Sequence, residues 1–366
     1  MQNKPVGWKI TQRAIVVKEI ERIIRLQKKI APELVNLIEE RYSILKHIRY
    51  NQPIGRRALA SQLEFSECSI RNGVKVLRDS GLIHLSGLGM TVTEEGQDMV
   101  SDLTAYVDAL SGLAKLEVYL ADELGVHEVK IVPGDSQSDR CVFLELGRVA
   151  ARILADILSN NMVVAVSGGS TMAIVAESVD LCMPSILVVP TRGGLGEKVE
   201  RQANSVAAVM AGKLGGQYRL LHIPEILNDD AFEAIKATDS TVAEIEQLIK
   251  NADVLVHGIG RADIMVSRRS HMPKVAENIC KLGVGETLGH YFDLEGNCIY
   301  TYCNNGFRLN DLVGVGRKIA VAGGADKAEA IISVTRAGSK DVLVIDEAAA
   351  SSIQSIIKSE KSQRTF

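Results

Sequence analysis

The stretch that decides the fold of the front of this chain is residues 54–93, which read IGRRALASQLEFSECSIRNGVKVLRDSGLIHLSGLGMTVT. Apolar residues at helical spacing predict a short helix over residues 57–63, and Glu64-Phe65-Ser66 forms the break after it. A second helix is predicted to run from a Ser66 N-cap to about Asp79, because a serine hydroxyl can accept from a free backbone N–H of the first turn. Two short helices joined by a tight break predict a helix-turn-helix.

The second helix has two different sides. Ile70, Val74 and Leu77 are spaced by four and three positions and form a buried stripe. The side chains off this stripe are of the types that bind base edges and phosphates. Together with one arginine of the preceding helix, the predicted DNA-binding residues are Arg57, Ser69, Arg71, Asn72, Lys75 and Arg78.

A β-hairpin is predicted directly after these helices. Gly81 provides a left-handed stop for the second helix. Leu82–Leu85 and Met90–Thr93 alternate as two short strands, with the turn at residues 86–89 between them. The pattern therefore predicts a winged helix-turn-helix, and the alternative is a helical hairpin that has no role with nucleic acid.

The distribution of charge favours DNA binding. The whole chain has 42 Lys and Arg, 45 Asp and Glu, and a formal net charge of −3. Residues 1–100 hold more basic than acidic side chains, whereas the rest of the chain is acidic. A basic front on an acidic protein is the electrostatic pattern of a DNA-binding module.

Length and composition limit the remaining classes. A chain of 366 residues that is 46% hydrophobic has room for two or three domains with large cores. There is no run of about 18 apolar residues and no secretory leader, so a cytoplasmic protein without contact to membranes is expected. The six cysteines lack CxxC spacing, and neither they nor the seven histidines predict a metal site.

Two helical segments flank the winged module. Residues 1–30 are basic and are either an arm that contacts DNA or a solvated extension; Pro32 then begins a helix that runs to about Tyr50. A further helix is expected over residues 97–124. Its stripe, which Glu117 interrupts, serves either packing in its own domain or a dimer seam, of which we favour the seam; the stripe is Leu103, Tyr106, Leu110, Leu113 and Leu120.

From about residue 127 short apolar runs alternate with helical segments, which predicts an α/β sheet with helices on both faces. The predicted strands are Glu128–Val132, Val163–Ser167, Ile186–Pro190, Tyr218–His222, Val254–Gly258, Ile319–Ala322 and Val342–Ile345. The predicted helices lie near 140–159, 170–179, 199–214, 229–250 and 326–337. The expected domains are a DNA-binding domain (1–96), a linker or dimerisation helix (97–124) and an effector-binding domain (125–366).

The strand ends carry a recurring composition of glycines and anion-binding side chains. In open α/β sheets, ligands bind beyond the carboxyl ends of the strands. The loop Ser167-Gly168-Gly169-Ser170-Thr171 joins a strand to a helix, where backbone N–H groups, hydroxyls and the helix dipole favour an anion. Each loop alone is also compatible with a plain turn, but the set predicts a phosphorylated ligand. Further candidates are Arg192, Gln202, Arg268, Arg269, Glu286 and Lys327.

These motifs together resemble one known family. The winged module, the Ser167–Thr171 loop, Thr191-Arg192-Gly193-Gly194, Gln202-Ala203-Asn204 and Gly323-Gly324-x-x-Lys327 are similar to those of the SorC-type sugar-binding transcription regulators, and within that family to regulators of glycolytic operons. The resemblance implies a Rossmann-like effector domain related to sugar-phosphate isomerases and deaminases. It also implies fructose-1,6-bisphosphate as inducer, with no resident cofactor, and a homodimer or tetramer on double-stranded operator DNA.

The resemblance also implies roles for the site residues. Ser170, Thr171 and Lys327 would hold one phosphate, and Arg192 with either Arg268 or Arg269 the other. Gln202 and Glu286 would bind sugar hydroxyls. The competing hypothesis is an active sugar-phosphate isomerase or deaminase with Glu286 as general base, but no acid–base partner for Glu286 is evident from the sequence.

Overall fold

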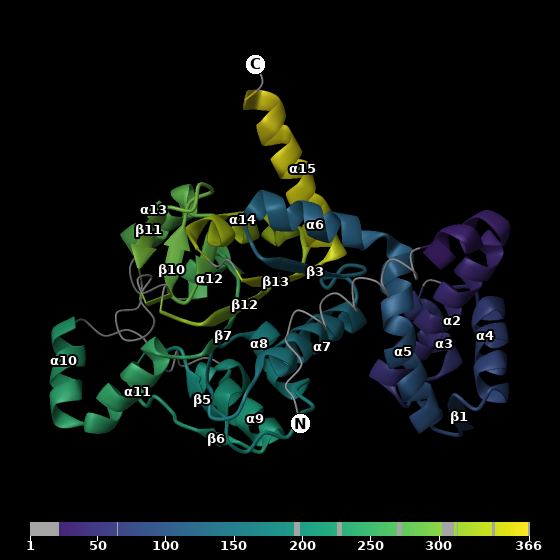
Figure 1. The fold of residues 1–366 in the computed structure, drawn as a ribbon, viewed down its shortest axis with the longest axis horizontal. Coiled ribbons are helices and arrows are strands. Elements are labelled where there is room, and N and C mark those ends of the chain that lie inside the picture. Colours follow the sequence, from purple (N-terminus) through teal and green to yellow (C-terminus); the bar gives the residue numbers. More distant parts are fainter. Residues whose placement is uncertain are drawn as a thin grey trace, which may run out of the picture. The chain divides into compact units, whose positions relative to one another are not determined.

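The computed structural model describes residues 22–63, 65–193, 198–224, 229–268, 273–301, 311–312, 314–338 and 341–364. The chain divides into two compact units, Met1–Ala114 and Lys115–Phe366 (Figure 1). Within the described ranges, no helix combines the length and the apolar character that crossing a bilayer requires.

The N-terminal unit is built from helices around one small core. Residues 22–30 form its first described helix; most of the predicted basic N-terminal arm, residues 1–21, lies outside the described residues. Side chains of every later element of the unit meet in one cluster that includes Ile48, Leu59, Ile70 and Met90. The elements are α2 (Pro32–Asn51), α3 (Arg56–Leu63), α4 (Glu67–Asp79), β1 (Ile83–Ser86), β2 (Gly89–Val92) and α5 (Glu94–Ser111).

The predicted turn between α3 and α4 and the predicted wing are confirmed. The Ser66 hydroxyl accepts from the Ser69 backbone N–H at 3.1 Å and caps α4. Strands β1 and β2 pair antiparallel with Ser86 opposite Gly89, so the turn is shorter than predicted. A bridge between Ile54 and Met90 attaches the hairpin to the start of the module.

The single helix predicted over residues 97–124 is wrong. Gly112 adopts a left-handed φ of 71°, which ends α5 at Ser111, and α6 (Leu113–Leu124) begins directly after it. The preferred dimer seam on this segment stays a prediction: Leu110, Leu113 and Leu120 are buried in a single copy, whereas Leu103 and Tyr106 are half-buried. Heptad spacing places residues on one face of a helix whether their partner is the same chain or another, so spacing could not decide between them.

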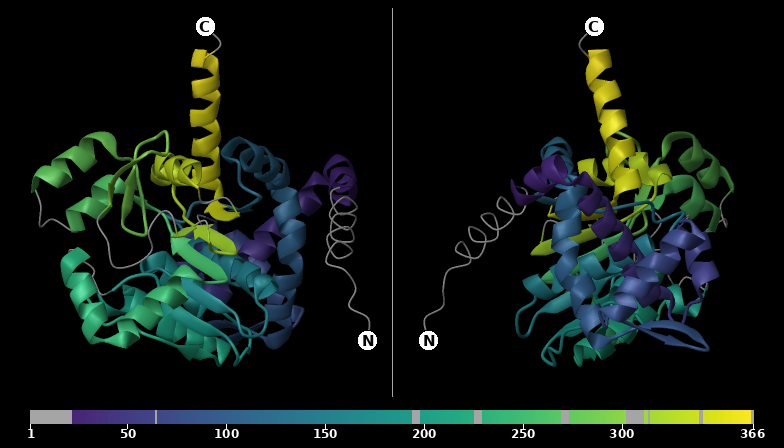
Figure 2. Two further views of the ribbon diagram at one scale, coloured as in Figure 1. Left: turned by 60° about the vertical axis from the view of Figure 1, so that its left-hand side comes forward. Right: turned by 90° about the vertical axis from the view of Figure 1, so that its right-hand side faces the viewer.

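A seven-stranded parallel sheet forms the centre of the C-terminal unit (Figure 2). All seven of its strands coincide with or overlap the predicted ones, and the order across the sheet is β3-β13-β12-β7-β4-β5-β6. The strands are β3 (Glu128–Val132), β4 (Val163–Val166), β5 (Leu187–Pro190), β6 (Gln217–Tyr218), β7 (Val254–Gly258), β12 (Arg317–Val321) and β13 (Val342–Asp346).

Helices cover both faces of this sheet, as predicted. Helices α7 (Arg140–Ile157), α8 (Ser170–Glu177) and α9 (Ala203–Leu214) pack on one face around Leu146, Val175 and Met210. On the other face, α10 (Asp229–Thr238) and α11 (Ser240–Lys250) pack around Phe232 and Ile245. The helix predicted over residues 229–250 is therefore two helices, because Asp239 caps a new one by accepting from the Thr241 N–H at 2.9 Å.

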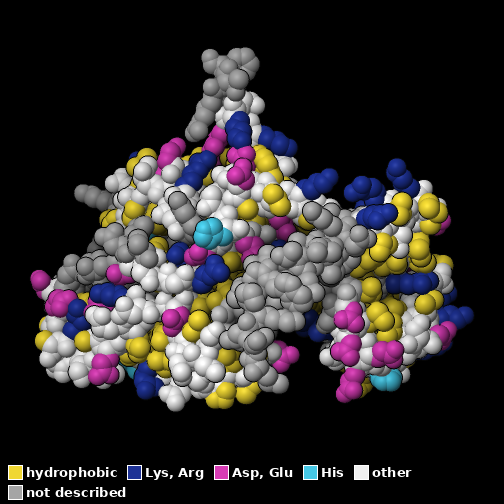
Figure 3. All heavy atoms as spheres, in the orientation of Figure 1, with side chains coloured by type: hydrophobic (Ala, Val, Ile, Leu, Met, Phe, Trp, Pro, Cys, Tyr) yellow, Lys and Arg dark blue, Asp and Glu magenta, His cyan; other side chains and the backbone are white. Residues whose placement is uncertain are grey.

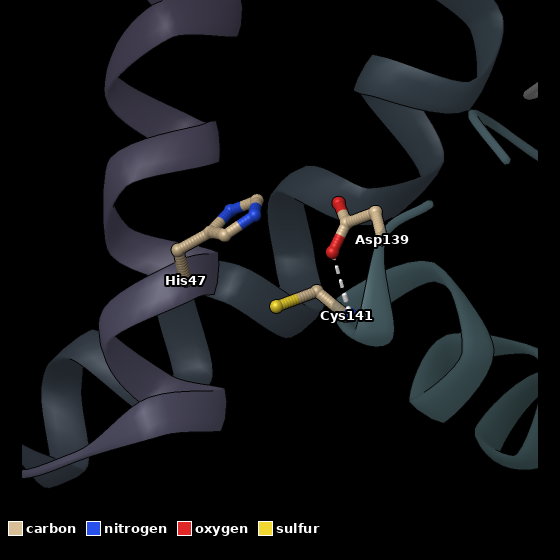
Figure 4. A group of neighbouring side chains, drawn as sticks. All are labelled: His47, Asp139 and Cys141. Carbon is tan, nitrogen blue, oxygen red and sulfur yellow. Dashed lines mark hydrogen bonds between the residues drawn. The ribbon is translucent and has the colours of Figure 1, made fainter. Parts of the chain in front are cut away.

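Aspartate also begins helix α7 on the opposite face. The Asp139 carboxylate accepts from the Cys141 backbone N–H at 2.7 Å (Figure 4). This bond satisfies one of the free donors of the first turn, and its negative charge is favoured at the positive end of the helix dipole. His47, also drawn in Figure 4, belongs to α2, where its Nδ1 lies 2.9 Å from the Ser43 carbonyl.

The order of the strands creates a crevice between β4 and β7. These strands are neighbours, but the chain leaves β4 toward β5 on one side and leaves β7 toward β12 on the other. The connections therefore diverge at the carboxyl ends of the two strands, and this is the position where open α/β sheets bind ligands.

A second, four-stranded antiparallel sheet was missed by sequence reasoning. Its strands are only two to four residues long, too short for a periodic pattern to distinguish them from loops. They are β8 (Gly260–Arg261), β9 (Gly285–Thr287), β10 (His290–Phe292) and β11 (Cys298–Thr301). The helices missed in this half are α12 (Ala262–Arg268), α13 (Pro273–Leu282) and α15 (Glu347–Arg364); α14 (Ala328–Ala337) was predicted.

Candidate functional site

A cavity of about 210 Å³ lies at the crevice between β4 and β7. Every described residue of the predicted effector set lines it: Gly168, Gly169, Ser170, Thr171, Arg192, Gln202, Arg268, Glu286 and Lys327. Arg269 lies outside the described residues. The loops that follow β4, β5, β7 and β12 thus converge, although their residues are up to about 160 positions apart in the chain.

The loop after β4 has the geometry of an anion cradle. Gly169 has a φ of 114°, which L side chains rarely adopt, and Ser170 and Thr171 then form the first turn of α8. The first N–H groups of a helix lack partners within it and favour negative charge. The neighbouring Ser167 hydroxyl accepts from the Gly258 N–H at 3.2 Å and connects this loop to the end of β7.

A short 3₁₀ helix, η1 (Val199–Arg201), closes one side of the loop. The Gly169 N–H donates to the Arg201 carbonyl at 2.7 Å. A Cβ atom on Gly168 would lie 2.6 Å from that same carbonyl oxygen, so only glycine permits this approach. The side chains of Lys198 and Arg201 are exposed and line the cavity, yet sequence reasoning missed both. The charged run that follows Thr191–Gly194 was the available signal.

Lys327 adds a further positive charge to the lining of the cavity. It ends η3 (Ala325–Lys327), which follows β12. Burial lowers the pKa of its ammonium group, while the carboxylates of Asp326 and Asp346 counteract that shift in part. A phosphate dianion would provide further negative charge beside this partly desolvated ammonium group and so stabilise its protonated form.

Arg261 was also missed and plays a different part. Its guanidinium donates to Asp263 at 2.6 Å and to Asp326 at 3.0 Å, and these bonds raise its pKa. Its charge is therefore already matched by carboxylates of α12 and η3. The Gln137 amide donates to the other oxygen of Asp326 at 2.6 Å, which extends this network to the loop after β3.

Glu286 enters the cavity from the second sheet. It lies on β9, is buried, and accepts from the Gly289 N–H at 2.8 Å. The hydroxyl of the adjacent Thr287 donates to the Gly258 carbonyl at 2.9 Å. The Thr287 hydroxyl oxygen therefore accepts from His257 Nδ1, also at 2.9 Å. Complete burial lowers the pKa of His257 to about 4, which keeps the imidazole neutral at physiological pH.

The predicted DNA-binding residues lie in the N-terminal unit and differ in availability. Arg57, Arg71, Asn72, Lys75 and Arg78 are exposed. The Ser69 hydroxyl donates to Glu40 of α2 at 2.6 Å, and Arg78 pairs with the adjacent Asp79 at 2.6 Å. In Figure 3, Lys and Arg side chains lie along the outer edge of this unit at α4, whereas Asp and Glu side chains gather over the start of α5.

A winged helix-turn-helix and an α/β unit with an anion cradle define a transcription regulator that senses a small metabolite. Two family models match the chain: "CggR N-terminal DNA binding domain" over residues 37–107 and "Putative sugar-binding domain" over residues 108–355. The chain belongs to the SorC family of sugar-binding transcriptional regulators. The resemblance predicted from the sequence is thereby confirmed.

Individual relatives agree with this assignment. The chain is 40% identical to the central glycolytic genes regulator of Priestia megaterium over 90% of its own length and 97% of that protein. Identity with the central glycolytic genes regulator of Bacillus subtilis is 39%, over 90% and 98%. A crystal structure described as a "putative SorC family transcriptional regulator" from Enterococcus faecalis is 36% identical, covers 66% of this chain and 99% of its own, and superposes with a TM-score of 0.61. These relatives are regulators and not enzymes, so the isomerase hypothesis is set aside.

Proposed function

We propose that this protein represses a glycolytic operon and that fructose-1,6-bisphosphate, held in the cavity between β4 and β7, relieves the repression. Two similar proteins are named central glycolytic genes regulators, which supports the choice of operon. The single observation that carries the effector is the cavity itself, where the loops of four parallel strands bring cationic, hydroxyl and amide groups together.

We assign the two phosphate groups of the bisphosphate to two different sets of lining residues. In our proposal Ser170, Thr171 and the first turn of α8 bind one phosphate together with Lys327. Arg192 and Arg268 bind the second, because a guanidinium offers paired donors to phosphate oxygens. The Gln202 amide donates to or accepts from the sugar hydroxyls between them, and the Glu286 carboxylate accepts from those hydroxyls. The bond that Glu286 accepts from the Gly289 N–H fixes the direction of its carboxylate.

The DNA-binding element of the proposed regulator is helix α4. Arg71, Asn72 and Lys75 are exposed on this helix, and we propose that they contact the operator in the major groove. The protein would act as a homodimer or tetramer, since helix-turn-helix proteins usually read two half-sites. The effector can change DNA affinity only by binding one arrangement of the oligomer more tightly than the other.

The test is operator binding measured by fluorescence anisotropy while fructose-1,6-bisphosphate is titrated. Fructose-6-phosphate and inorganic phosphate serve as comparison ligands, because each offers only one phosphate group. We expect release of DNA with the bisphosphate at concentrations where the comparison ligands have no effect. Operator affinity that stays constant up to millimolar concentrations of all three would refute the proposed switch.

A pair of arginine variants places the effect in the cavity. Arg192→Leu removes a guanidinium from the cavity, and the required bisphosphate concentration should rise at least about tenfold. Arg219→Leu is the matched control, because Arg219 is exposed, donates to the Tyr218 carbonyl and does not line the cavity. Equal sensitivity in the two variants would show that the effector binds elsewhere.

A further inference from the structure

Five large apolar side chains remain exposed at the start of the N-terminal unit. Three lie on the first helix (22–30) at spacings of three and four, and two lie on α2 three positions apart, so each set occupies one side of its helix. Their exposed fractions are 48% for Ile23, 52% for Leu26, 82% for Ile30, 44% for Leu34 and 38% for Leu37. We name these residues the N-terminal apolar face.

The opposite side of the same two helices is already used within the unit. Ile24 and Val35 are buried and pack with Leu110 of α5. Lys28 Nζ donates to the Leu110 carbonyl at 2.8 Å, and the Tyr106 hydroxyl donates to Gln27. These contacts fix the two helices on α5, so the N-terminal apolar face cannot turn inward without breaking them. Its partner must come from outside the described residues of the unit.

The arrangement of the face is symmetric about Ile30. Ile23 precedes Ile30 by as many positions as Leu37 follows it, and the same holds for Leu26 and Leu34. A two-fold axis through Ile30 that bisects the two helices would lay the first helix of one copy antiparallel on α2 of the other. Isologous interfaces have this property, because one patch must be complementary to itself.

Charge shows the same complementarity. Residues 22–29 contain Arg22, Arg25, Lys28 and Lys29 and no acid, whereas residues 31–38, which pairing about Ile30 sets opposite them, contain Glu33 and no base; Glu39 is the next residue. Two-fold pairing about Ile30 sets the basic half of each copy against the acidic half of the other. A parallel arrangement would instead oppose like charges, which is unfavourable.

We propose that the N-terminal apolar face binds the same face of a second copy of this chain, antiparallel about Ile30, and so joins two winged modules into one dimer. The pairing deepens the proposed homo-oligomer by naming one of its surfaces. It is tested without DNA or effector, so its failure is distinguishable from failure of the proposed repressor switch.

Charge reversal in the full-length chain gives the first test. Arg22→Glu with Arg25→Glu and Lys29→Glu makes both halves of the face acidic, and Glu33→Lys with Glu39→Lys makes both halves basic. Sedimentation velocity over a dilution series should show dimer dissociation constants at least about tenfold higher for each variant alone. An equimolar mixture of the two should recover native association, because opposite charges face each other again. Arg71→Glu with Lys75→Glu, which reverses exposed charges on α4, is the control.

Cross-linking locates the axis even where another surface also holds copies together. In a chain whose native cysteines are replaced, Ile30→Cys should oxidise to a covalent dimer, because Ile30 meets its own copy at the axis. Gln62→Cys, exposed on α3 of the same unit, should not. If Ile30→Cys cross-links no more than Gln62→Cys, or if mixing the charge variants restores nothing, the pairing is wrong. The face is then covered by residues 1–21 or by another protein.

Discussion

At the scale of single residues, Lys327 governs how the cavity responds to pH. Its pKa lies below the ordinary 10.5 of lysine because burial disfavours the ammonium form. A bound phosphate favours that form, so binding is linked to protonation. We therefore expect the affinity for a bisphosphate to be highest below the lowered pKa of Lys327 and to fall as the pH rises through that value.

Variants at Lys327 separate charge from shape. Lys327→Met should weaken fructose-1,6-bisphosphate binding roughly 10- to 150-fold, which corresponds to about 1.5–3 kcal/mol for a bond to a charged group. It should also remove the loss of affinity at alkaline pH. Lys327→Arg keeps its charge and should bind with little dependence on pH. Isothermal titration measures both effects, with the exposed Lys281→Met as control. A loss of affinity at high pH that persists in Lys327→Met would assign the effect to another group.

Two glycines of the same unit predict opposite effects of alanine. A Cβ on Gly168 would lie 2.6 Å from the Arg201 carbonyl oxygen and 3.0 Å from the Ala203 nitrogen. Both are backbone atoms, so Gly168→Ala should lower the free energy of unfolding by about 1–3 kcal/mol and also weaken effector binding. No atom lies within 4 Å of a Cβ on Gly212 inside α9, where alanine should instead stabilise by about 1 kcal/mol. Thermal unfolding measures the change in stability of both variants relative to the native chain.

The cavity residues were predictable one by one, because strand ends and glycine-rich turns are local signals. Ser170, Arg192 and Lys327 each follow a buried strand, and the rule that such loops share one edge of the sheet brought them together. Ser69 shows what local signals cannot supply. Its position on α4 suits DNA, but its hydroxyl donates to Glu40, which is 29 positions earlier in the chain.

At the scale of elements, Glu117 explains the interruption of the apolar stripe. It lies on α6, and its carboxylate accepts from the Ile131 N–H at 3.0 Å. Strand β3 is at the edge of the parallel sheet, so this N–H has no neighbouring strand to receive it. The side chain thus satisfies a donor of an exposed edge, which edge strands otherwise offer to other chains.

Burial raises the pKa of Glu117 above 4.5, although Lys130 counteracts it. A raised carboxyl pKa means that this group stabilises the fold below 4.5 and that the stabilisation is lost as the pH rises through the folded value. Glu117→Gln keeps an acceptor and should be at least as stable as the native chain at neutral pH. Glu117→Leu leaves the N–H unpaired and should lose about 1–3 kcal/mol. Denaturant unfolding at two pH values decides this, and equal losses in both variants would contradict it.

On helix α4, we expect some side chains to contact DNA phosphates and others to contact base edges. Lys75→Ala should weaken binding to all DNA sequences and reduce the salt dependence by the equivalent of about one phosphate contact. Asn72→Ala should relax the preference for one base pair by about 1–3 kcal/mol with the salt dependence unchanged. Anisotropy at several salt concentrations, on operator and on mutated operator, separates the two. The converse pattern would mean that α4 is docked differently.

The parallel strands were predictable because several, such as β4 and β5, are β-branched and continuously apolar, and all but β6 are four to five residues long. In β6 only two residues pair. The antiparallel sheet was not, and it carries Glu286. Sequence reasoning therefore found Glu286 as an acid among glycines without the strand that positions it. The order of β4 and β7 in the sheet is likewise a long-range property that no local pattern contains.

At the scale of the whole molecule, the two units have separate hydrophobic cores. A ligand stabilises only what it binds, by about 2.7 kcal/mol at a concentration of 100 times its dissociation constant. Calorimetry of the full chain should therefore show fructose-1,6-bisphosphate raising the unfolding temperature of the C-terminal unit and leaving that of the N-terminal unit in place. Inorganic phosphate at equal concentration is the control. Equal shifts of both transitions would mean that the units unfold as one.

The position of Lys327 has a consequence for the newly made protein. The winged module is complete on the ribosome about 230 residues before Lys327 is translated, a delay of roughly 10–45 seconds at the usual rates of synthesis. During that interval the nascent chain already has its DNA-reading helix but lacks a wall of the cavity between β4 and β7. The nascent chain therefore cannot yet bind the proposed effector. Effector binding becomes possible only after Lys327 has been made and the last strands of the sheet have joined.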